Sequence, residues 1–288
     1  MPTVTLPHGE VHYREAGPLH PPSAPPVVFV HGILVDSTMW SEVASLLAAE
    51  GVRSFAPDLP LGSHTRPVAA TADQSPRGIA RQVIKFLEAL DLTDVTLVGN
   101  DTGGAICQYL LDTDRSRIGR LVLTNCDCFE QFPPPSLQRF IELMRRPAAL
   151  AGVGQAMRST TFRHGRFGYG PFARQYDATM TRAWIEPART DARIREDVAR
   201  FASAVDPADL AEVGARLHQF AGPVKLVWGN ADPYFPMDLA RRLAAAFSEA
   251  TITEVDRART FVPLDAPDRV AAEILQVANA AGSRPAAG

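Results

Sequence analysis

Short apolar runs alternate with amphipathic segments along the first half of the chain. The apolar runs occupy residues 27–30, 52–59, 94–100 and 118–126. Runs of this length that lack polar alternation are typical of strands buried on both faces. The segments between them, at residues 40–51, 75–90 and 103–114, repeat apolar positions at helical spacing. Strands that alternate with helices predict a mainly parallel, doubly wound α/β sheet.

The N-terminal residues follow a different pattern. Residues 3–17 alternate apolar and polar side chains around His8-Gly9, which predicts an antiparallel hairpin at the edge of the sheet. At the next amphipathic segment, Ser75 and Pro76 form a typical start of a helix, because serine caps the end and proline suits the first turn.

The alternation stops after Cys128 and resumes near residue 224. Arginine-rich segments with helical character, separated by proline and glycine, fill this gap at residues 136–146, 172–185 and 191–205. The strand and helix pattern then returns and closes with a helix over 267–281. We therefore expect an α/β core formed by residues 1–131 and 221–282, a helical cap over 132–220, and a flexible tail at 283–288.

Composition narrows the possible functions. Apolar residues make up 46% of the 288 residues and charged residues 21%, which is typical of a globular protein, and the net charge of −3 gives no reason to expect nucleic acid as a partner. No apolar run approaches the roughly 18 residues that span a bilayer, and the start of the chain lacks a signal-peptide pattern. The three cysteines form no disulfide or metal pattern. We expect a cytoplasmic protein with a small-molecule substrate and no metal or cofactor; its oligomeric state stays open.

A glycine-rich turn carries the main candidate for chemistry. Gly99-Asn100-Asp101-Thr102-Gly103 lies between a predicted strand and a predicted helix, as in a nucleophile elbow, where a strained turn presents one side chain above the sheet. The alternative is a simple turn in which Asp101 caps the following helix.

These pieces resemble the α/β-hydrolase superfamily over essentially the full chain apart from the cap. The matching stretches are VVFVHG, FAPDLPLGS, LVGNDTGGA, LVWGNADPYFP and FVPLDAPDRVAAEI. The aspartate elbow followed by two glycines is most similar to the haloalkane dehalogenase and epoxide hydrolase branch. That resemblance implies an aspartate nucleophile, a histidine base and an acidic partner.

Position by position, the resemblance makes Asp101 the nucleophile and Asp232 the acid that follows the next-to-last core strand. Asp232 could instead be only a turn residue before Pro233, and Asp127 stands where some dehalogenases hold their acid. The backbone amides of Ile33, after His31-Gly32, and of Thr102 would form the oxyanion hole.

The expected histidine is missing. Thr260 stands where the family carries it, in Arg259-Thr260-Phe261, and no histidine follows His218. Threonine has no basic form at neutral pH. A carboxylate can still attack carbon and form an ester, but the hydrolysis of that ester needs a base, whose loss typically costs roughly 10²–10⁴-fold in rate.

Other residues could serve the pocket. His64 could replace the base or be a solvated loop residue, and His164 in the cap could face the cleft. His8, His12, His20 and His218 look peripheral. The candidates for substrate binding are His31, which normally shapes the oxyanion loop, Trp40, Tyr169 and Tyr176. The cap arginines could bind a carboxylate or phosphate, or could form a solvated helix face; they are Arg158, Arg163, Arg166, Arg174 and Arg182.

Three functions remain compatible with these residues. The first is an α/β-fold hydrolase of a small organic substrate such as a haloalkane, epoxide or ester, slowed or altered by Thr260. The second is a lyase, isomerase or cyclase in which Asp101 moves a proton. The third is a catalytically silent protein that binds a ligand in the same pocket.

Overall fold

A single sheet of eight strands forms the centre of the computed structural model, which describes residues 1–18 and 24–280. The strand order is β1-β2-β4-β3-β5-β6-β7-β8; β1 and β2 run antiparallel to their neighbours, and β3 to β8 are parallel. The strands are β1 (Thr3–Leu6), β2 (Gly9–Ala16), β3 (Val27–Val30), β4 (Ser54–Pro57), β5 (Val95–Asp101), β6 (Ile118–Cys126), β7 (Val224–Gly229) and β8 (Ala250–Val255). The predicted edge hairpin and parallel sheet are confirmed, and the expected tail and His20 lie outside the described residues.

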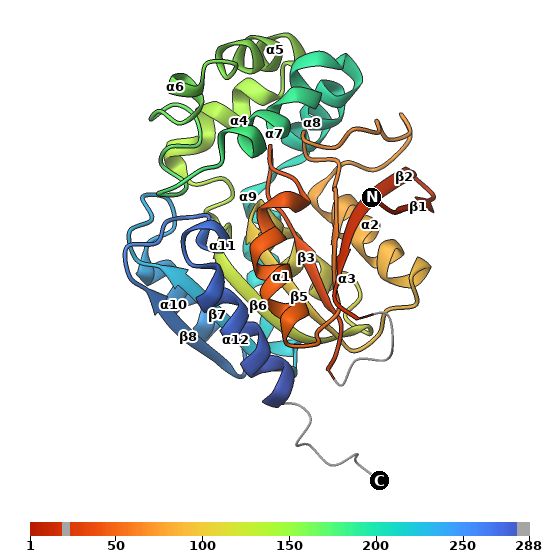
Figure 1. The fold of residues 1–288 in the computed structure, drawn as a ribbon, viewed down its shortest axis with the longest axis vertical. Helices are drawn as coiled ribbons and strands as arrows, with labels where there is room; N and C mark the ends of the chain where they lie inside the picture. The colour runs from red at the N-terminus through yellow and green to blue at the C-terminus, as the bar shows by residue number, and fades with distance from the viewer. Residues whose placement is uncertain (19–23, 281–288) are drawn as a thin grey trace.

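Helices cover both faces of this sheet (Figure 1). On one face lie α1 (Ser41–Ala49), α11 (Val262–Asp265) and α12 (Pro267–Ala280). On the other face lie α2 (Pro76–Ala89), α3 (Thr102–Thr113) and α10 (Met237–Ala245). Ser75 caps α2 by accepting a hydrogen bond from the Gly78 amide at 3.0 Å, as the sequence predicts.

The core forms because the central strands bury both of their faces. In β3, Val28 and Val30 pack toward α2 and α3, whereas Val27 and Phe29 pack toward α1 and α12. All four side chains are fully buried. A strand whose alternate residues enter two different cores must be apolar throughout, which is the pattern that the sequence shows.

The segment between β6 and β7 is helical. It contains α4 (Gln138–Met144), α5 (Pro147–Ala156), α6 (Thr160–Arg163), α7 (Ala178–Thr190), α8 (Ala192–Ala204) and α9 (Pro207–Gly214). Figure 1 shows α4 to α8 as a layer beyond one end of the sheet. The helix expected over 172–185 begins only at Ala178, because Asp177 caps it and residues 172–177 are irregular.

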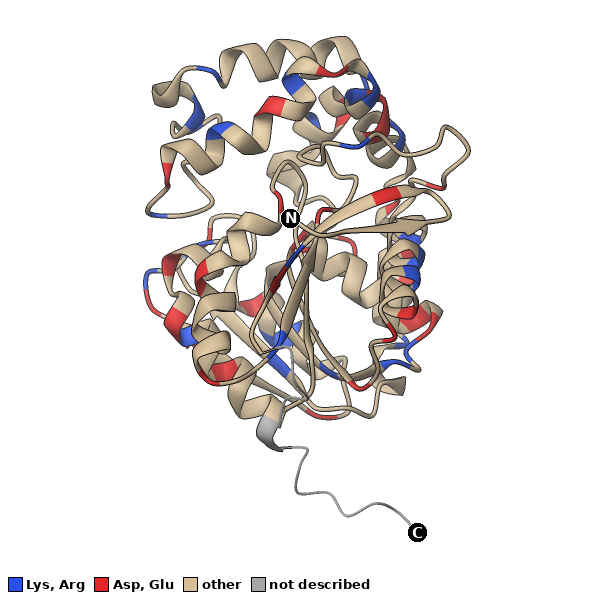
Figure 2. Cartoon of the chain, turned by 45° about the vertical axis from the view of Figure 1, so that its right-hand side comes forward, with Lys and Arg blue, Asp and Glu red and all other residues tan. Residues whose placement is uncertain are grey.

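Charges are distributed over both layers, with acidic and basic residues interspersed in the view of Figure 2. Within the described residues, no helix has the length and apolar content required to cross a membrane.

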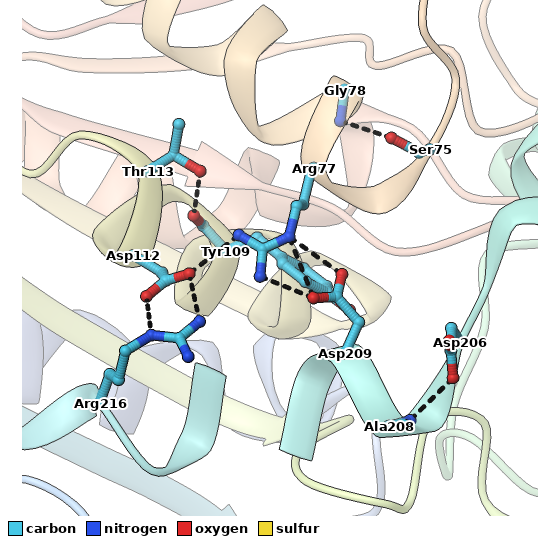
Figure 3. Close-up of polar contacts among 10 residues, drawn as sticks. All are labelled: Ser75, Arg77, Gly78, Tyr109, Asp112, Thr113, Asp206, Ala208, Asp209 and Arg216. Carbon is cyan, nitrogen blue, oxygen red and sulfur yellow. Dashed lines mark hydrogen bonds and ion pairs between the residues drawn. The ribbon is translucent and has the colours of Figure 1, made fainter. Parts of the chain in front are cut away.

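A cluster of charged side chains joins α9 to the core (Figure 3). Arg77 of α2 donates to Asp209 of α9 (3.0 Å) and to Asp112 of α3 (2.8 Å), and Arg216 donates to Asp112 (2.6 Å). The Arg77 guanidinium also lies 5.2 Å from the centre of the Tyr109 ring. These contacts connect three helices at the point where the chain returns from the cap toward β7.

The first prediction concerns Asp112. Its hydrogen bonds from Arg216, more than those from Arg77, lower its pKa to about 2. Because this folded-state pKa is below the ordinary value, the stabilisation is present above about pH 4 and is lost as the pH falls toward 2. Asp112→Asn should therefore reduce the free energy of unfolding at pH 7 by about 1–2 kcal/mol, measured by urea denaturation.

The matched control is Asp91→Asn, because the Asp91 side chain is 93% exposed and Asn tolerates its left-handed backbone conformation. Equal stability of Asp112→Asn and the control at pH 7 would contradict the role given to this cluster.

Candidate active site

Asp101 occupies a strained turn at the carboxyl end of β5. Its φ of 53° and ψ of −131° lie outside the regions that non-glycine residues prefer, and α3 begins at the next residue. The neighbouring glycines make this turn possible: a Cβ on Gly103 would overlap the carbonyl oxygen of Val30, and one on Gly32 would overlap the Asp101 carboxylate. The Asp101 side chain makes no capping hydrogen bond to α3, unlike the simple-turn alternative.

The Asp101 carboxyl is buried against two backbone amides. Burial is the largest effect and raises its pKa to about 7. Hydrogen bonds from the amides of Thr102 and Ile33 favour the ionised form, whereas the nearby charge of Asp232 disfavours it. The two amides expected to form the oxyanion hole therefore lie near enough to the carboxylate of Asp101 to lower its pKa.

Asp232 lies behind Asp101 in the turn after β7. Its Oδ2 accepts from Asn125 Nδ2 and its Oδ1 from the Tyr234 amide, both at 2.8 Å. Burial nevertheless raises its pKa to about 6. Asn125, which sequence reasoning missed, also accepts a hydrogen bond from the Gly229 amide (2.6 Å) and so joins the ends of β6 and β7. Its position at the end of β6, close to Asp127, was the available signal.

Thr260 fills the position of the expected histidine as a fully buried residue. Its hydroxyl faces Asp232 closely enough to lower the pKa of that carboxyl, without forming a hydrogen bond of good geometry. Its backbone carbonyl accepts from Asn100 Nδ2 at 2.7 Å, a second contact that the sequence did not reveal. The site thus has a small hydroxyl where a base would stand.

Asp127 places a third carboxyl at this edge of the sheet. It is 2% exposed, and its Oδ1 has no hydrogen-bond partner among the described residues. Burial, and then the charge of Asp101, raise its pKa well above the ordinary value. In the part of the chain that the structure describes, no lysine, arginine or histidine forms an ion pair with Asp101, Asp127 or Asp232.

A cavity of about 390 Å³ lies above Asp101, between the core and the cap. Its floor is formed by Ile33, Asp101, Thr102 and Asp127. Most of its walls are apolar and come from the cap and the loops beside it: Leu34, Pro133, Pro134, Leu137, Phe140, Ile141, Met157, Phe167, Tyr169, Phe172, Tyr234 and Phe261. This volume suits a small organic molecule.

The structure does not bring His64 to this cavity. His64 Nε2 lies 3.1 Å from Asp197 Oδ2 on the cap helix α8, so this histidine joins cap and core. His31 accepts a hydrogen bond from the Leu59 amide at 2.8 Å and supports the loop under Asp101 without lining the cavity. No histidine within residues 1–18 and 24–280 lines it.

Of the aromatic candidates, only Tyr169 lines the cavity within the described residues. Its hydroxyl donates to the Leu34 carbonyl at 2.5 Å. Trp40 is fully buried against Phe29, with ring centres 4.7 Å apart, because it belongs to the core under α1. Tyr176 donates to the Tyr169 carbonyl behind the cavity wall. His164 stacks on the Tyr176 ring and likewise does not reach the cavity.

Two exposed arginines lie at the cavity. Arg166 is the one candidate of the five cap arginines that lines it, and Arg139, which sequence reasoning missed, lines it as well. Neither forms an ion pair with the rest of the described chain. Arg163 is buried and donates to the Met157 carbonyl (2.7 Å) and to Thr181 Oγ1 (3.0 Å), so it holds the cap together.

Residues 27–273 match the model of the alpha/beta hydrolase family, and the chain belongs to this family. The sequence-based expectation of an enzyme in the haloalkane dehalogenase-like branch of this family is confirmed.

Two relatives and one solved structure are similar to this chain over most of its length. The chain is 27% identical to haloalkane dehalogenase 2 of Mycobacterium tuberculosis, over 93% of this chain and 91% of that protein. It is 26% identical to the 2-hydroxy-6-oxononadienedioate/2-hydroxy-6-oxononatrienedioate hydrolase of Paraburkholderia xenovorans, over 84% and 81%. The crystal structure of a protein named DbjA superposes with a TM-score of 0.79 at 19% identity, covering 99% and 100%, which shows the shared fold.

The second prediction follows from the buried carboxyl of Asp101. Its folded-state pKa of about 7 exceeds the ordinary value near 4, so the folded protein loses stability as the pH rises from 4 through 7. Asp101→Asn removes this charge, and asparagine tolerates a positive φ. The variant should be more stable than the wild type by about 1–4 kcal/mol at pH 8, and this difference should shrink toward pH 4, in urea denaturation.

The comparison variant is Asp112→Asn, which should be less stable than the wild type at pH 7, whereas Asp101→Asn should be more stable at pH 8. A stability difference between Asp101→Asn and wild type that is the same at pH 4 and pH 8 would contradict the elevated pKa of Asp101.

Proposed function

We propose that the protein is a hydrolase that uses the Asp101 carboxylate as a nucleophile toward carbon in a small, largely apolar substrate. One observation carries this proposal: Asp101 lies at the floor of the cavity, with two backbone amides near enough to its carboxylate to favour the ionised form. A carboxylate attacks carbon without prior deprotonation and forms an ester. The same two amides would stabilise the oxyanion when water adds to that ester.

The leaving group is proposed to be an oxygen rather than a halide. Thr102 directly follows Asp101, and apart from the exposed Arg139 and Arg166 the described walls of the cavity are largely apolar. Opening of an epoxide or displacement of an ester oxygen fits a floor that carries a second, buried carboxyl, Asp127.

The substrate is proposed to carry an anionic group at one end. Arg139 and Arg166 lie at the cavity without ionic partners, whereas the floor carries the carboxyls of Asp101 and Asp127. This separation of charge would place a carboxylate of the substrate near Arg139 and Arg166, and the reacting carbon of the substrate at the floor. The relative from Paraburkholderia xenovorans is named for a dioate substrate, which supports this orientation.

A second candidate function is proton transfer without hydrolysis, as in a lyase, isomerase or cyclase. The observation that favours it is the pKa of Asp101, which lies near 7, where a carboxyl can both give and take a proton. A catalytically silent binding protein would have the same cavity. Covalent chemistry distinguishes the first function from the other two.

The third prediction is a covalent adduct on Asp101. Incubation of the protein with bromoalkanes and with epoxides of matched length should add the mass of one alkyl or hydroxyalkyl group, located on the peptide that contains Asp101. Asp101→Asn should form no adduct. The measurement is intact-protein mass spectrometry over time, followed by peptide mapping.

Asp232→Asn provides a related test, because it keeps the nucleophile and removes a nearby charge. Loss of the Asp232 charge should lower the pKa of Asp101, so the rate of adduct formation should increase at a lower pH in this variant than in the wild type. Absence of any adduct in the wild-type protein across the panel, with turnover of an isomerisation or elimination substrate, would favour the second candidate and overturn the first.

The fourth prediction concerns the arginines. The wild type should form adducts faster with a bromoalkanoic acid than with a bromoalkane of equal length. The double substitution Arg139→Ala/Arg166→Ala should reduce this preference roughly threefold to tenfold, as expected for two exposed ionic contacts. Arg182→Ala, an exposed cap arginine that does not line the cavity, is the control. An unchanged preference in the double variant would rule out this subsite.

A further inference from the structure

We propose that Asp127 supplies the acid and base function that the missing histidine would provide. In this proposal its carboxyl protonates the leaving oxygen while the Asp101 ester forms, and then takes a proton from the water that hydrolyses the ester. The inference rests on the proposed nucleophilic role of Asp101 and goes beyond it by naming the group that completes turnover.

The strand register places the two carboxyls together. Asp101 of β5 pairs with Cys126 of β6, so Asp127 directly follows the residue opposite the nucleophile. Neighbouring strands lie about 4.8 Å apart, and both side chains line the floor of the same cavity. The Asp127 backbone is fixed by a hydrogen bond from Gln108 Nε2 to its carbonyl at 2.8 Å.

The Asp127 carboxyl is available for proton transfer. It is 2% exposed, and its Oδ1 has no partner in the described part of the chain. The Thr102 hydroxyl lowers the pKa of Asp127, but burial has the larger effect and favours the neutral acid, which is the form that can protonate a leaving group.

Other side chains near the floor are less suited. Asp232 does not line the cavity, and both of its oxygens accept hydrogen bonds. The Tyr169 hydroxyl is engaged by the Leu34 carbonyl. Tyr234 lines the cavity, but burial raises the pKa of its phenol, so it stays protonated and cannot accept a proton from water.

Electrostatic coupling gives Asp127 both roles in turn. The titratable groups around it are the carboxyls of Asp101 and Asp232 and the thiols of Cys126 and Cys128. The thiols are neutral because burial raises their pKa values. While Asp101 is ionised, its charge helps to raise the pKa of Asp127 and keep it protonated. Once Asp101 is a neutral ester, that repulsion is gone, so the pKa of Asp127 falls and its carboxylate form becomes more accessible.

For an epoxide, the steps balance as follows. An oxygen of Asp101 bonds to the substrate carbon as the epoxide C–O bond breaks, and the freed oxygen takes the proton of Asp127. Asp127 then takes a proton from water, whose oxygen bonds to Cγ of Asp101. The intermediate releases the substrate oxygen as an alkoxide, which takes the proton of the new Asp101 carboxylic acid. Asp101 returns as carboxylate, Asp127 as acid, and the product is a diol. Paired carboxyls divide acid and base work similarly in retaining glycosidases.

The fifth prediction compares Asp127→Asn with the wild type, using a bromoalkane and an epoxide of equal length. Bromide leaves without a proton, so the variant should form the bromoalkane adduct at the wild-type rate. That adduct should then persist, with hydrolysis at least roughly 10²-fold slower than in the wild type. The epoxide adduct should form more slowly in the variant, because its leaving oxygen needs the proton. Intact-protein mass spectra over time measure all three rates.

Asp238→Asn, which changes an aspartate 90% exposed on α10, is the control and should match the wild type. The bromoalkane adduct also shows that Asp127→Asn is folded with a competent nucleophile. Hydrolysis of that adduct at the wild-type rate, or failure of the folded variant to form it, would overturn the role of Asp127. If the wild type forms no adduct and releases neither bromide nor diol, the proposed function itself fails, which is a different result.

Discussion

The burial of three carboxyls at one edge of the sheet, with no ion pair to them from residues 1–18 or 24–280, is the constraint on which this site depends. Asp101 ends β5, and Asp127 and Asp232 follow the neighbouring strands β6 and β7, so the parallel topology brings the three together. Burial raises the pKa of each. A histidine at the position of Thr260 would offset this charge as an imidazolium. Here backbone amides and the Asn125 amide do so in part, and protons must do the rest.

The helices between β6 and β7 supply much of the cavity wall over this site. They close an apolar cavity of about 390 Å³ over the carboxyls, which keeps them poorly solvated and sustains their elevated pKa values. His64 and Asp197, and the cluster around Arg77, hold the cap and its return helix to the core. The cap therefore contributes both the shape of the pocket and the electrostatic environment of Asp101.

Local signals in the sequence predicted the core well and the surroundings of the site less well. The elbow at Asp101, the amides of Ile33 and Thr102, and the strands were predictable because each depends on contiguous residues. His64 was misplaced as a candidate base because its partner Asp197 lies 133 positions away in the cap. Asn125 and Asn100 were missed for the same reason, because their contacts join distant segments, and Arg139 was missed because its place at the cavity depends on the whole fold.

The fate of the oxygen in the attacking water tests the central claim most directly. A single turnover of an epoxide in isotopically labelled water should place the heavy oxygen in the carboxylate of Asp101, because water adds to Cγ of the ester. The diol from that first turnover should contain only unlabelled oxygen. Label in the diol and none in the peptide containing Asp101 would mean that water attacks the substrate directly, and would contradict a covalent role for Asp101.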